Sequence, residues 1–463
     1  MNFDLIVIGS GPGGYVAAIR AAQLGMKVAV VERSELGGIC LNWGCIPTKA
    51  LLKSAQVYEY ALHAKEYGVV IPEGVQPDLP AMVARSRGVA DNMSKGIQYL
   101  FKKNNITVII GSGQLKTNNS VEVKDAEGSV TSYEANHIIL ATGARSRELP
   151  GMKQDGKHII GYREALTLQV IPKSMVVVGS GAIGSEFAFF YQSLGVQVTL
   201  IEYLPNILPL EDEDVSKQME RSFKKKGMKV MTATAVEKAD VEGGLCKVYV
   251  KTKKGDEVLE AEIVLSAVGI STNLDGIGLE EAGVKTENGK VIVDSMYRTN
   301  VSGVYAIGDI IPGPALAHVA SAEGIICVEA IAGKNPEPLD YKNIPGCTYT
   351  VPEVASVGLT EKQAIEAGYE IKVGKFPYTA SGKATAAGNR DGFIKVIFDA
   401  KYGEWLGAHM VGLNVTEMIA EAVVARKLET TGHEILKAVH PHPTMSEAVM
   451  EAVAAAYGEA IHI

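Results

Sequence analysis

Two cysteines with four residues between them stand in a glycine-rich segment, residues 37–49 (GGICLNWGCIPTK). A helical pattern over residues 48–60 follows Cys45, and a thiol at the start of a helix has a lowered pKa and is a better nucleophile. Cys40 and Cys45 can close a small disulfide loop if their Cα atoms approach to about 5.5 Å. The spacing therefore indicates a redox-active thiol pair.

The plain alternative for this pair is two buried, inert thiols, because buried cysteines often behave as small hydrophobic residues. A zinc site would need two more ligands nearby, so we predict no metal. The other three cysteines are far apart in the sequence, at Cys246, Cys327 and Cys347. That spacing excludes a disulfide scaffold.

One supersecondary unit occurs twice in the chain. Residues 6–32 match residues 176–202 without a gap. Each copy has a β-branched run, a glycine-rich turn, a helix ending at Leu-Gly, and a second β-branched run ending in glutamate. Both copies therefore predict a βαβ unit.

Each copy also carries the features of a dinucleotide site. The G-x-G-x-x-G spacing permits a tight turn and lets backbone N–H groups approach a pyrophosphate at a helix N-terminus. A glutamate closing the second strand can accept hydrogen bonds from a ribose. One such turn alone is equally typical of a plain loop, but two in register indicate two sites. The residues are Gly9, Gly11, Gly14 and Glu32 in the first copy, and Gly179, Gly181, Gly184 and Glu202 in the second.

The nicotinamide cofactor of the second site is predicted to be NAD. A 2'-phosphate would be repelled by Glu202 and would need a basic partner. Residues 203–210 contain neither arginine nor lysine.

The repeat suggests four parts along the chain. Residues 1–145 and 146–270 each contain one copy, and residues 271–345 return to the first site. From residue 346 to 463 short strands alternate with alanine-rich helices and no glycine-rich turn occurs, which predicts a separate α+β domain.

Composition narrows the class of protein further. A chain of 463 residues with 47% hydrophobic residues needs more than one core. The formal charge of -8 comes without a basic run, which argues against nucleic acid as a partner. The most apolar early stretch, residues 5–19, is too short and too rich in glycine to span a membrane. No basic region precedes it as in a secretory signal, so we expect a cytoplasmic protein.

Six motifs together resemble the pyridine nucleotide-disulfide oxidoreductases over residues 4–459: GSGPGG at residue 9, GGICLNWGCIPTK at 37, ATG at 141, GSGAIGSE at 179, GDIIPGPALAH at 308 and HPHPTMSEA at 440. The resemblance implies an α/β fold with two Rossmann-like dinucleotide-binding domains. It also implies a C-terminal α+β dimerisation domain, and hence that the protein is a homodimer. FAD would occupy the first site and NAD the second.

The resemblance also implies which residues contact the cofactors. Asp309 would bind the ribityl chain of FAD, and residues 315–318 would line its isoalloxazine ring. The full FAD set is Gly9, Gly11, Gly14, Glu32, Lys49, Gly113, Thr142, Gly143, Asp309, Ala315, Leu316, Ala317 and His318. The NAD set is Gly179, Gly181, Gly184, Glu186, Glu202, Val236 and Gly269.

Catalytic roles follow from the same resemblance. Cys45 would face the flavin, and Cys40 would exchange with the substrate. Lys49 would lie beside the flavin N5 and pair with Glu186, which stands where the first copy has Val16. Without the resemblance, Lys49 is a solvated helix lysine and Glu186 a first-turn acid that favours the helix dipole.

His442 corresponds to the acid-base histidine of the family and Glu447 to the carboxylate that orients it. The alternative is a capping box from Thr444 to Glu447, with His442 as an ordinary loop residue. A cis bond between His442 and Pro443 is left open. Pro441 and Trp43 depart from the usual family pattern, near the histidine and in the cysteine loop.

Within the family the motifs are most similar to those of members that oxidise dihydrolipoyl groups with NAD. Such an enzyme would serve lipoyl domains of a 2-oxo acid dehydrogenase or of the glycine cleavage system. Two alternatives stay open: a member reducing another small disulfide with a nicotinamide cofactor, and a mainly structural subunit of a larger assembly.

Overall fold

The computed structural model describes residues 2–463, which form two compact units. The first unit contains the residues up to Leu51, Pro80–Arg147 and Ile270–Leu339. The second contains Leu52–Leu79, Glu148–Gly269 and Asp340–Ile463. The four-part division expected from the sequence is finer than these two units and stays a prediction.

The first unit is built on a seven-stranded sheet in the order β3-β2-β1-β6-β5-β4, with β19 also paired to β6. Strands β1, β2, β3, β6 and β19 run parallel, whereas β4 and β5 are antiparallel. The strands are β1 Asn2–Ile8, β2 Val28–Glu32, β3 Thr107–Ile110, β4 Ser112–Thr117, β5 Ser120–Lys124, β6 Val130–Leu140 and β19 Val304–Ala306.

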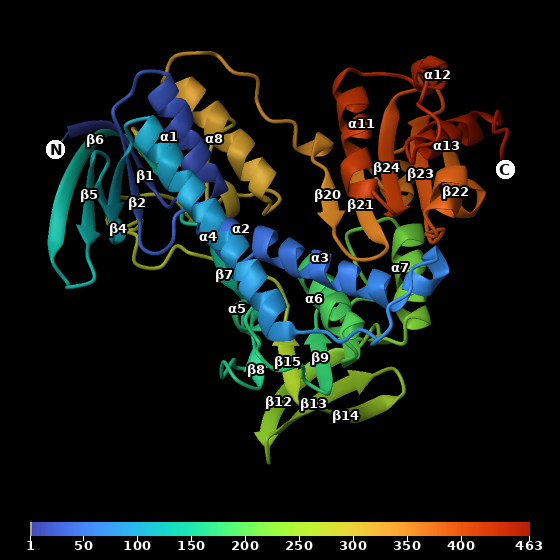
Figure 1. Ribbon diagram of the computed structural model, residues 1–463. Coiled ribbons are helices and arrows are strands. Elements are labelled where there is room, and N and C mark those ends of the chain that lie inside the picture. The colour runs from blue at the N-terminus through green and yellow to red at the C-terminus, as the bar shows by residue number, and fades with distance from the viewer. Residues whose placement is uncertain (1) are drawn as a thin grey trace. The chain divides into compact units, whose positions relative to one another are not determined.

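Helices α1 (Pro12–Gln23) and α8 (Ala317–Ile331) lie side by side on this sheet (Figure 1). A Cβ added at Gly324 would lie 2.7 Å from the Gly13 carbonyl oxygen. Only a residue without a side chain permits such a close approach of two helices. The pairing of β19 with β6, followed by α8, brings late residues of the chain back to the first repeat.

The cysteine segment forms two helices, α2 (Gly38–Asn42) and α3 (Cys45–Leu62). The sequence predicted one helix from residue 48 to 60, and its start was wrong by three residues. Pro47 falls in the first turn of α3, where a missing N–H costs no helical hydrogen bond. Helix α4 (Leu79–Lys103) is the longest of those described.

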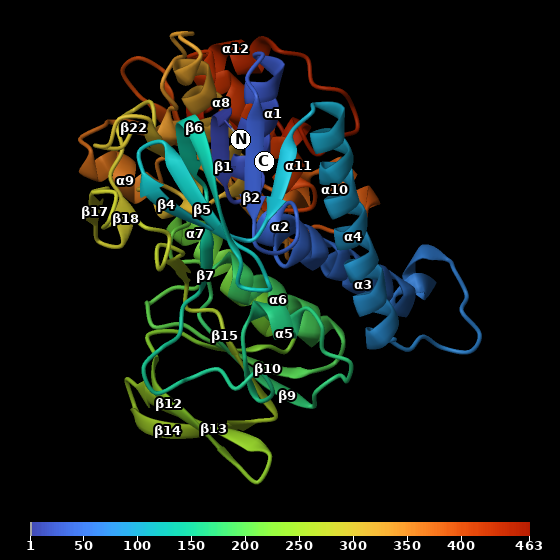
Figure 2. The ribbon, with the colours of Figure 1, turned by 90° about the vertical axis from the view of Figure 1, so that its left-hand side faces the viewer.

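The second unit contains a parallel sheet in the order β11-β10-β9-β15-β8. An antiparallel sheet of β12, β13 and β14 lies next to β9 and β15 (Figure 2). The elements are β8 Ile159–Ile160, β9 Ser174–Val178, α6 Ala182–Ser193, β10 Gln197–Ile201, α7 Glu213–Lys225, β11 Lys229–Met231, β12 Ala235–Glu242, β13 Leu245–Thr252, β14 Gly255–Ala261 and β15 Ile263–Ser266.

The C-terminal part is an antiparallel sheet in the order β20-β21-β24-β23-β22, packed against α11 and α13. Every residue of β23 and β24 is buried, which makes them the centre of this core. The bounds are β20 Gly346–Thr348, β21 Glu353–Gly358, β22 Ile371–Pro377, β23 Phe393–Asp399, β24 Trp405–Gly412, α11 Val415–Lys427 and α13 Glu447–Tyr457. The mixed sheet of the first unit, the parallel sheet of the second and this α+β part confirm the predicted fold class.

The remaining elements are short. They are β7 Ala144–Ser146, β16 Ile270–Thr272, β17 Thr286–Glu287, β18 Lys290–Val291, α5 Tyr162–Ala165, α9 Glu361–Glu366, α10 Gly382–Ala386, α12 Gly432–Lys437 and the 3-10 turns η1 Ala64–Tyr67, η2 Gly308–Ile310, η3 Tyr341–Asn343 and η4 Tyr378–Ala380. Among the described residues, no helix is both long and apolar enough to cross a membrane.

Candidate active site

The first and third glycines of each G-x-G-x-x-G turn are required by close packing against the protein's own backbone. Gly9 has a φ of 103°, and a Cβ there would lie 2.2 Å from the Ala141 carbonyl oxygen. A Cβ at Gly14 would lie 1.9 Å from the Gly9 oxygen. The second repeat shows the same geometry, since a Cβ at Gly184 would lie 1.9 Å from the Gly179 oxygen. Any side chain at these positions would clash with backbone.

The middle glycines, Gly11 and Gly181, have no such reason within the protein. They are the N-caps of α1 and α6, with φ of -63° and -64°, a region open to every residue. A Cβ at either would meet no protein atom within 4 Å. A phosphate group approaching the backbone N–H groups of a helix N-terminus does account for glycine here. Both turns therefore fit a dinucleotide.

The predicted ribose carboxylates have matching surroundings. Glu32 is 8% exposed, and its Oε2 accepts hydrogen bonds from Ser10 N at 2.9 Å and Ser10 Oγ at 2.6 Å. Its Oε1 accepts from Ser34 N at 2.9 Å. Glu202 makes the corresponding three bonds, two from Ser180 and one from the backbone two residues further on. Because a carboxylate has about four acceptor positions, each can still bind a ribose hydroxyl.

Cys40 and Cys45 lie on different helices, since Cys40 is within α2 and Cys45 is the first residue of α3. Both are thiols, with Cys40 partly buried and Cys45 exposed. The amide of Asn42 stabilises the turn before them by donating to Leu36 O at 2.9 Å and Gly38 O at 3.0 Å. The chain thus changes direction between the two sulfurs.

The surroundings of Cys40 favour its protonated form. A hydrogen bond with the Cys45 side chain raises the pKa of Cys40 far above its usual range, and burial and the charge of Cys45 add to this. The charge of Lys49 acts in the opposite direction. That Cys45 is the sulfur that faces the flavin stays a prediction.

All residues predicted to contact FAD lie in the first unit. Thr142 and Gly143 follow β6, and Thr142 Oγ1 donates to Asn273 O at 2.8 Å. Gly143 has a φ of 67°. Gly113 is in β4, where a Cβ would lie 3.0 Å from the Val31 side chain. Gly113 and Gly143 carry no side chain, and the contact of all three residues with FAD stays a prediction.

Asp309 is in η2, directly after β19. Burial raises the pKa of its carboxyl group, and the charge of Lys290 opposes this shift. Residues 315–318 precede and begin α8. Glu323 of α8 was missed from the sequence, although its Oε2 accepts the Gly308 N–H at 2.6 Å. Little in the sequence indicated this role, because α8 also contains Glu329 and nothing local separates the two acids.

The residues predicted to contact NAD lie in the second unit, as does Glu186. Glu186 is 4% exposed on α6, and its Oε1 accepts a hydrogen bond from Tyr349 N at 3.0 Å. Val236 lies in β12, and Gly269 follows β15 with a φ of 106°. Lys49 belongs to the first unit, so its pairing with Glu186 stays a prediction.

His442 and Glu447 form a hydrogen-bonded pair, with Nδ1 and Oε1 2.8 Å apart. Burial acts to raise the pKa of Glu447, but the Thr444 N–H and His442 outweigh it and hold the pKa below its usual value. An ionised carboxylate only accepts, so Nδ1 donates and Nε2 is left as the basic nitrogen. The peptide bond between His442 and Pro443 is cis.

Glu447 makes one hydrogen bond that is expected from each of the two interpretations. Its Oε2 accepts from Thr444 N at 2.8 Å, as one half of a capping box, while its Oε1 holds His442. The other half is missing, because the Thr444 hydroxyl donates to Pro441 O and Ser446 is the N-cap of α13. The cap therefore helps to position the carboxylate.

Two more histidine–carboxylate pairs, missed from the sequence, lie in the same part of the second unit. His462 Nδ1 lies 2.6 Å from Glu451, which is one turn after Glu447 on α13. His440 Nε2 lies 2.7 Å from Glu421 on α11. The spacing of Glu447 and Glu451 could have indicated from the sequence that Glu451 also binds a histidine. It could not indicate the partners, because His462 and His440 both lie outside the helices.

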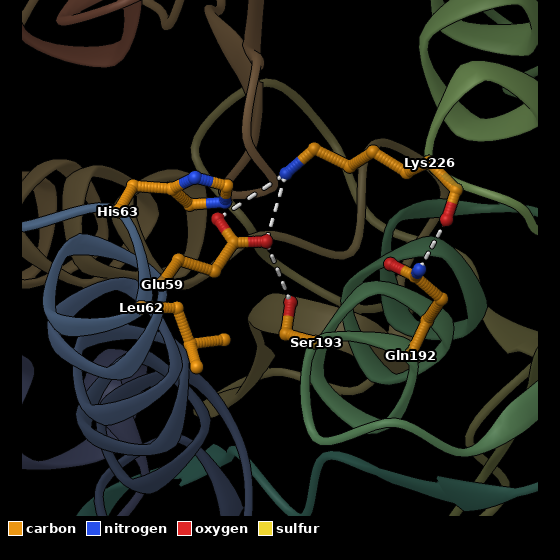
Figure 3. A pocket seen from close by; sticks show the side chains of 6 residues that line it. All are labelled: Glu59, Leu62, His63, Gln192, Ser193 and Lys226. Atoms are coloured by element: carbon orange, nitrogen blue, oxygen red, sulfur yellow. Dashed lines mark hydrogen bonds and ion pairs between the residues drawn. The ribbon is translucent and has the colours of Figure 1, made fainter. Parts of the chain in front are cut away.

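A surface pocket of about 390 Å³ lies elsewhere in the second unit, lined by Glu59, Leu62, His63, Gln192, Ser193 and Lys226 (Figure 3). Its two charged groups pair with each other, since Lys226 Nζ lies 2.9 Å from Glu59 Oε1. Ser193 Oγ donates to the same carboxylate at 3.2 Å. None of the predicted site residues lines this pocket.

The chain belongs to the pyridine nucleotide-disulphide oxidoreductase family. The family model matches residues 3–324, and the dimerisation domain of the same family matches residues 344–453. These matches define a flavoprotein disulfide oxidoreductase that uses FAD and NAD, as predicted, and the second one indicates a homodimer.

Individual relatives cover the whole chain. It is 49% identical to a dihydrolipoyl dehydrogenase of Rhizobium etli, over 100% of this chain and 99% of that protein. It is 50% identical to a dihydrolipoyl dehydrogenase of Zymomonas mobilis, with the same coverage. Among solved structures, LpdA from Mycobacterium tuberculosis superposes with a TM-score of 0.90 and 28% identity, over 97% of this chain and 98% of that chain.

Proposed function

We propose that the chain is a dihydrolipoyl dehydrogenase, which oxidises dihydrolipoyl groups and reduces NAD+ to NADH through FAD and a disulfide between Cys40 and Cys45. The observation that carries this proposal is the thiol pair on two helices of the first nucleotide unit. It is supported by identity of about half to two dihydrolipoyl dehydrogenases over the full chain.

In the thiol step, His442 Nε2 takes a proton from the substrate dithiol. The resulting thiolate attacks Cys40 of the disulfide, and Cys45 leaves as a thiolate. The second substrate thiol attacks the mixed disulfide, its proton passes to the Cys40 sulfur as that sulfur leaves, and the oxidised lipoyl group is released while His442 holds the first proton. The raised pKa of Cys40 makes it the cysteine that keeps a proton afterwards. Two electrons and two protons thus leave the substrate.

Bound FAD would supply the two-electron chemistry that connects the reduced cysteine pair with hydride transfer to NAD+. The Gly11 turn, Glu32 and Asp309 would hold FAD, and the Gly181 turn and Glu202 would hold NAD. We assign Lys49 and Glu186 to a pair beside the flavin. We assign Glu447 to orienting His442.

We infer that the substrate arrives on a lipoyl domain of a 2-oxo acid dehydrogenase or of the glycine cleavage system, in the cytoplasm. In the homodimer, His442 and Glu447 of one subunit would serve the thiol pair of the other. The position of the dyad in the C-terminal part supports this, since that part matches the family's dimerisation domain.

The function is tested with purified protein, a cofactor assay and a substrate panel. We expect a yellow protein that releases FAD on denaturation and oxidises dihydrolipoamide with NAD+ far faster than with NADP+. Equal use of the two nicotinamides, or faster reduction of glutathione disulfide with NADPH, would favour the alternative member of the family. A colourless protein that FAD does not reconstitute would exclude both and leave a structural subunit.

The roles of the two sulfurs are tested by comparing Cys45→Ser with Cys40→Ser. The reduced Cys40→Ser protein should keep the long-wavelength absorbance of a thiolate next to the flavin, and Cys45→Ser should lose it. Reversed spectra would exchange the roles assigned to the two cysteines.

The shared site is tested by combining Cys45→Ser chains with His442→Gln chains. Random pairing makes half of the dimers mixed, and each mixed dimer has one site free of both substitutions. Activity should then return to about a quarter of that of the unmodified enzyme. No recovery in verified mixed dimers would show that each chain builds its own site.

A further inference from the structure

The approach of the two thiols depends on an interruption between two helices. In one continuous helix, positions 40 and 45 would lie about 140° apart around the axis, and their side chains would diverge. The structure ends α2 at Asn42 and begins α3 at Cys45. Trp43, with φ of -137° and ψ of 14°, is the residue that leaves the helical path. Groups that hold this break therefore control the sulfur geometry.

Arg87, on α4, contacts both residues at the break. Its Nη1 donates to Asn42 O at 2.5 Å, and its guanidinium lies 4.1 Å from the centroid of the Trp43 ring. The Asn42 carbonyl belongs to the last turn of α2, where carbonyls have no partner inside the helix. A cation there is also favoured by the helix dipole. Arg87 thus caps α2 and stacks on the residue that ends it.

The two residues before Arg87 bind the same segment at other points. Arg85 Nη1 donates to Ala50 O at 2.8 Å, and Ser86 Oγ donates to Pro47 O at 2.8 Å. Both carbonyls lie after Cys45, within α3. Among the bonds described for these three neighbouring side chains, the one to a residue between the cysteines comes from Arg87. Arg85 is therefore a control of matching charge on the same helix.

We propose that Arg87, stacked on Trp43, is a positioning residue that sets the dithiol–disulfide equilibrium of Cys40 and Cys45. Holding the break keeps the sulfurs near each other in the reduced state, so less conformational entropy is lost when the disulfide closes. Without Arg87, the disulfide is less stable relative to the dithiol. This inference rests on the proposed redox role of the pair.

The test measures the equilibrium directly, without enzyme turnover. Holoenzyme and variants are equilibrated without oxygen in mixtures of reduced and oxidised dithiothreitol, alkylated, and scored for free Cys40 and Cys45 by mass spectrometry. Arg87→Ala should shift the equilibrium about tenfold toward the dithiol, which is about 30 mV for a two-electron couple. Arg85→Ala should stay within about twofold of the unmodified protein.

Variants of Trp43 test the same contact from its other side. Trp43→Val should shift the equilibrium in the same direction as Arg87→Ala, whereas Trp43→Phe, which keeps a ring under the guanidinium, should shift it less. The double variant of Arg87→Ala and Trp43→Val should shift the equilibrium by less than the sum of the two single shifts, because both substitutions remove the same contact. Arg87→Lys, which keeps the charge without the planar fork, should be intermediate and serves if Arg87→Ala does not fold.

Two results would overturn the inference: an unshifted Arg87→Ala, or equal shifts for Arg87→Ala and Arg85→Ala, which would mean general loosening. If the unmodified protein forms no disulfide at any buffer ratio, the proposed function itself fails. Flavin content and the unfolding midpoint are measured for every variant, and a selective change in the thiol equilibrium at unchanged midpoint supports positioning.

Discussion

The two βαβ units of this chain share one backbone design and differ in what surrounds it. In β1-α1-β2 and β9-α6-β10 the middle glycine has the same conformation, and the carboxylate closing the second strand makes the same three bonds. One difference lies two residues after the third glycine, where the first unit has Val16 and the second has the buried Glu186.

The other difference lies after the second strand. Beyond β2 the chain continues to Cys40 and Cys45. Beyond β10 it continues to Glu211 and Asp212, and Asp212 pairs with the buried Lys395 at 2.8 Å. The same segment thus carries reactive sulfurs in one unit and a packing contact to the C-terminal sheet in the other. A shared nucleotide turn therefore does not decide the chemistry of a site; its flanking residues do.

The largest contrast is expected from adding a methyl group at the third glycine of each unit. Gly14→Ala and Gly184→Ala create the same 1.9 Å clash with backbone. Gly14→Ala should lose FAD and about 100-fold or more of the activity, while Gly184→Ala should keep FAD and lose NAD reduction by about the same factor. The measurements are the flavin-to-protein ratio and NADH formation. If both variants lose FAD, the assignment of one cofactor to each unit is wrong.

Replacing Glu186 by valine, the residue at the matching position (Val16) of the first βαβ unit, should have the next largest effect. Glu186→Val should keep FAD and lower kcat by about 10- to 100-fold, because a buried carboxylate assigned to the Lys49 pair is removed. Glu186→Gln removes the charge but keeps an acceptor for the Tyr349 N–H. It therefore tests the role of the charge separately from the role of this hydrogen bond. A Glu186→Val enzyme with unchanged kcat would leave Glu186 as an ordinary first-turn acid.

Glu202→Gln and Glu32→Gln form a matched pair with a smaller effect. Glu202→Gln should lower kcat/KM for NAD by about 10-fold, since hydrogen bonds to a charged group contribute about 1.5–3 kcal/mol. Glu32→Gln should instead weaken FAD retention and leave KM for NAD unchanged. The readouts are steady-state kinetics with NAD and NADP, and FAD release during dilution. An NAD effect from Glu32→Gln would contradict the division between the units.

The smallest effect concerns the segment after β10. Burial raises the pKa of Glu211 to about 7 from 4.5. The folded state therefore binds this proton more tightly, so the contribution to stability is full below pH 4.5 and is lost as pH rises through about 7. Glu211→Gln should raise the free energy of unfolding by about 1–3 kcal/mol at pH 8. Denaturant unfolding at pH 4 should show almost no gain, and an equal gain at both pH values would exclude this titration as the cause.

The sequence by itself determined the features that depend on local backbone needs. The two glycine turns, the strands before and after them, and the cysteine pair could be predicted because glycine conformation, β-branched runs and residue spacing act over a few residues. Even here a boundary failed, since Pro47 was compatible with a helix that begins at Cys45.

Only the tertiary structure decided the contacts between distant residues. It joined Glu186 to Tyr349, Arg87 to Asn42, and His462 to Glu451. It also set the strand order of the C-terminal sheet, where β24 lies between β21 and β23. Such pairings follow from how whole elements pack, and no local preference of either partner specifies which distant residue it will meet.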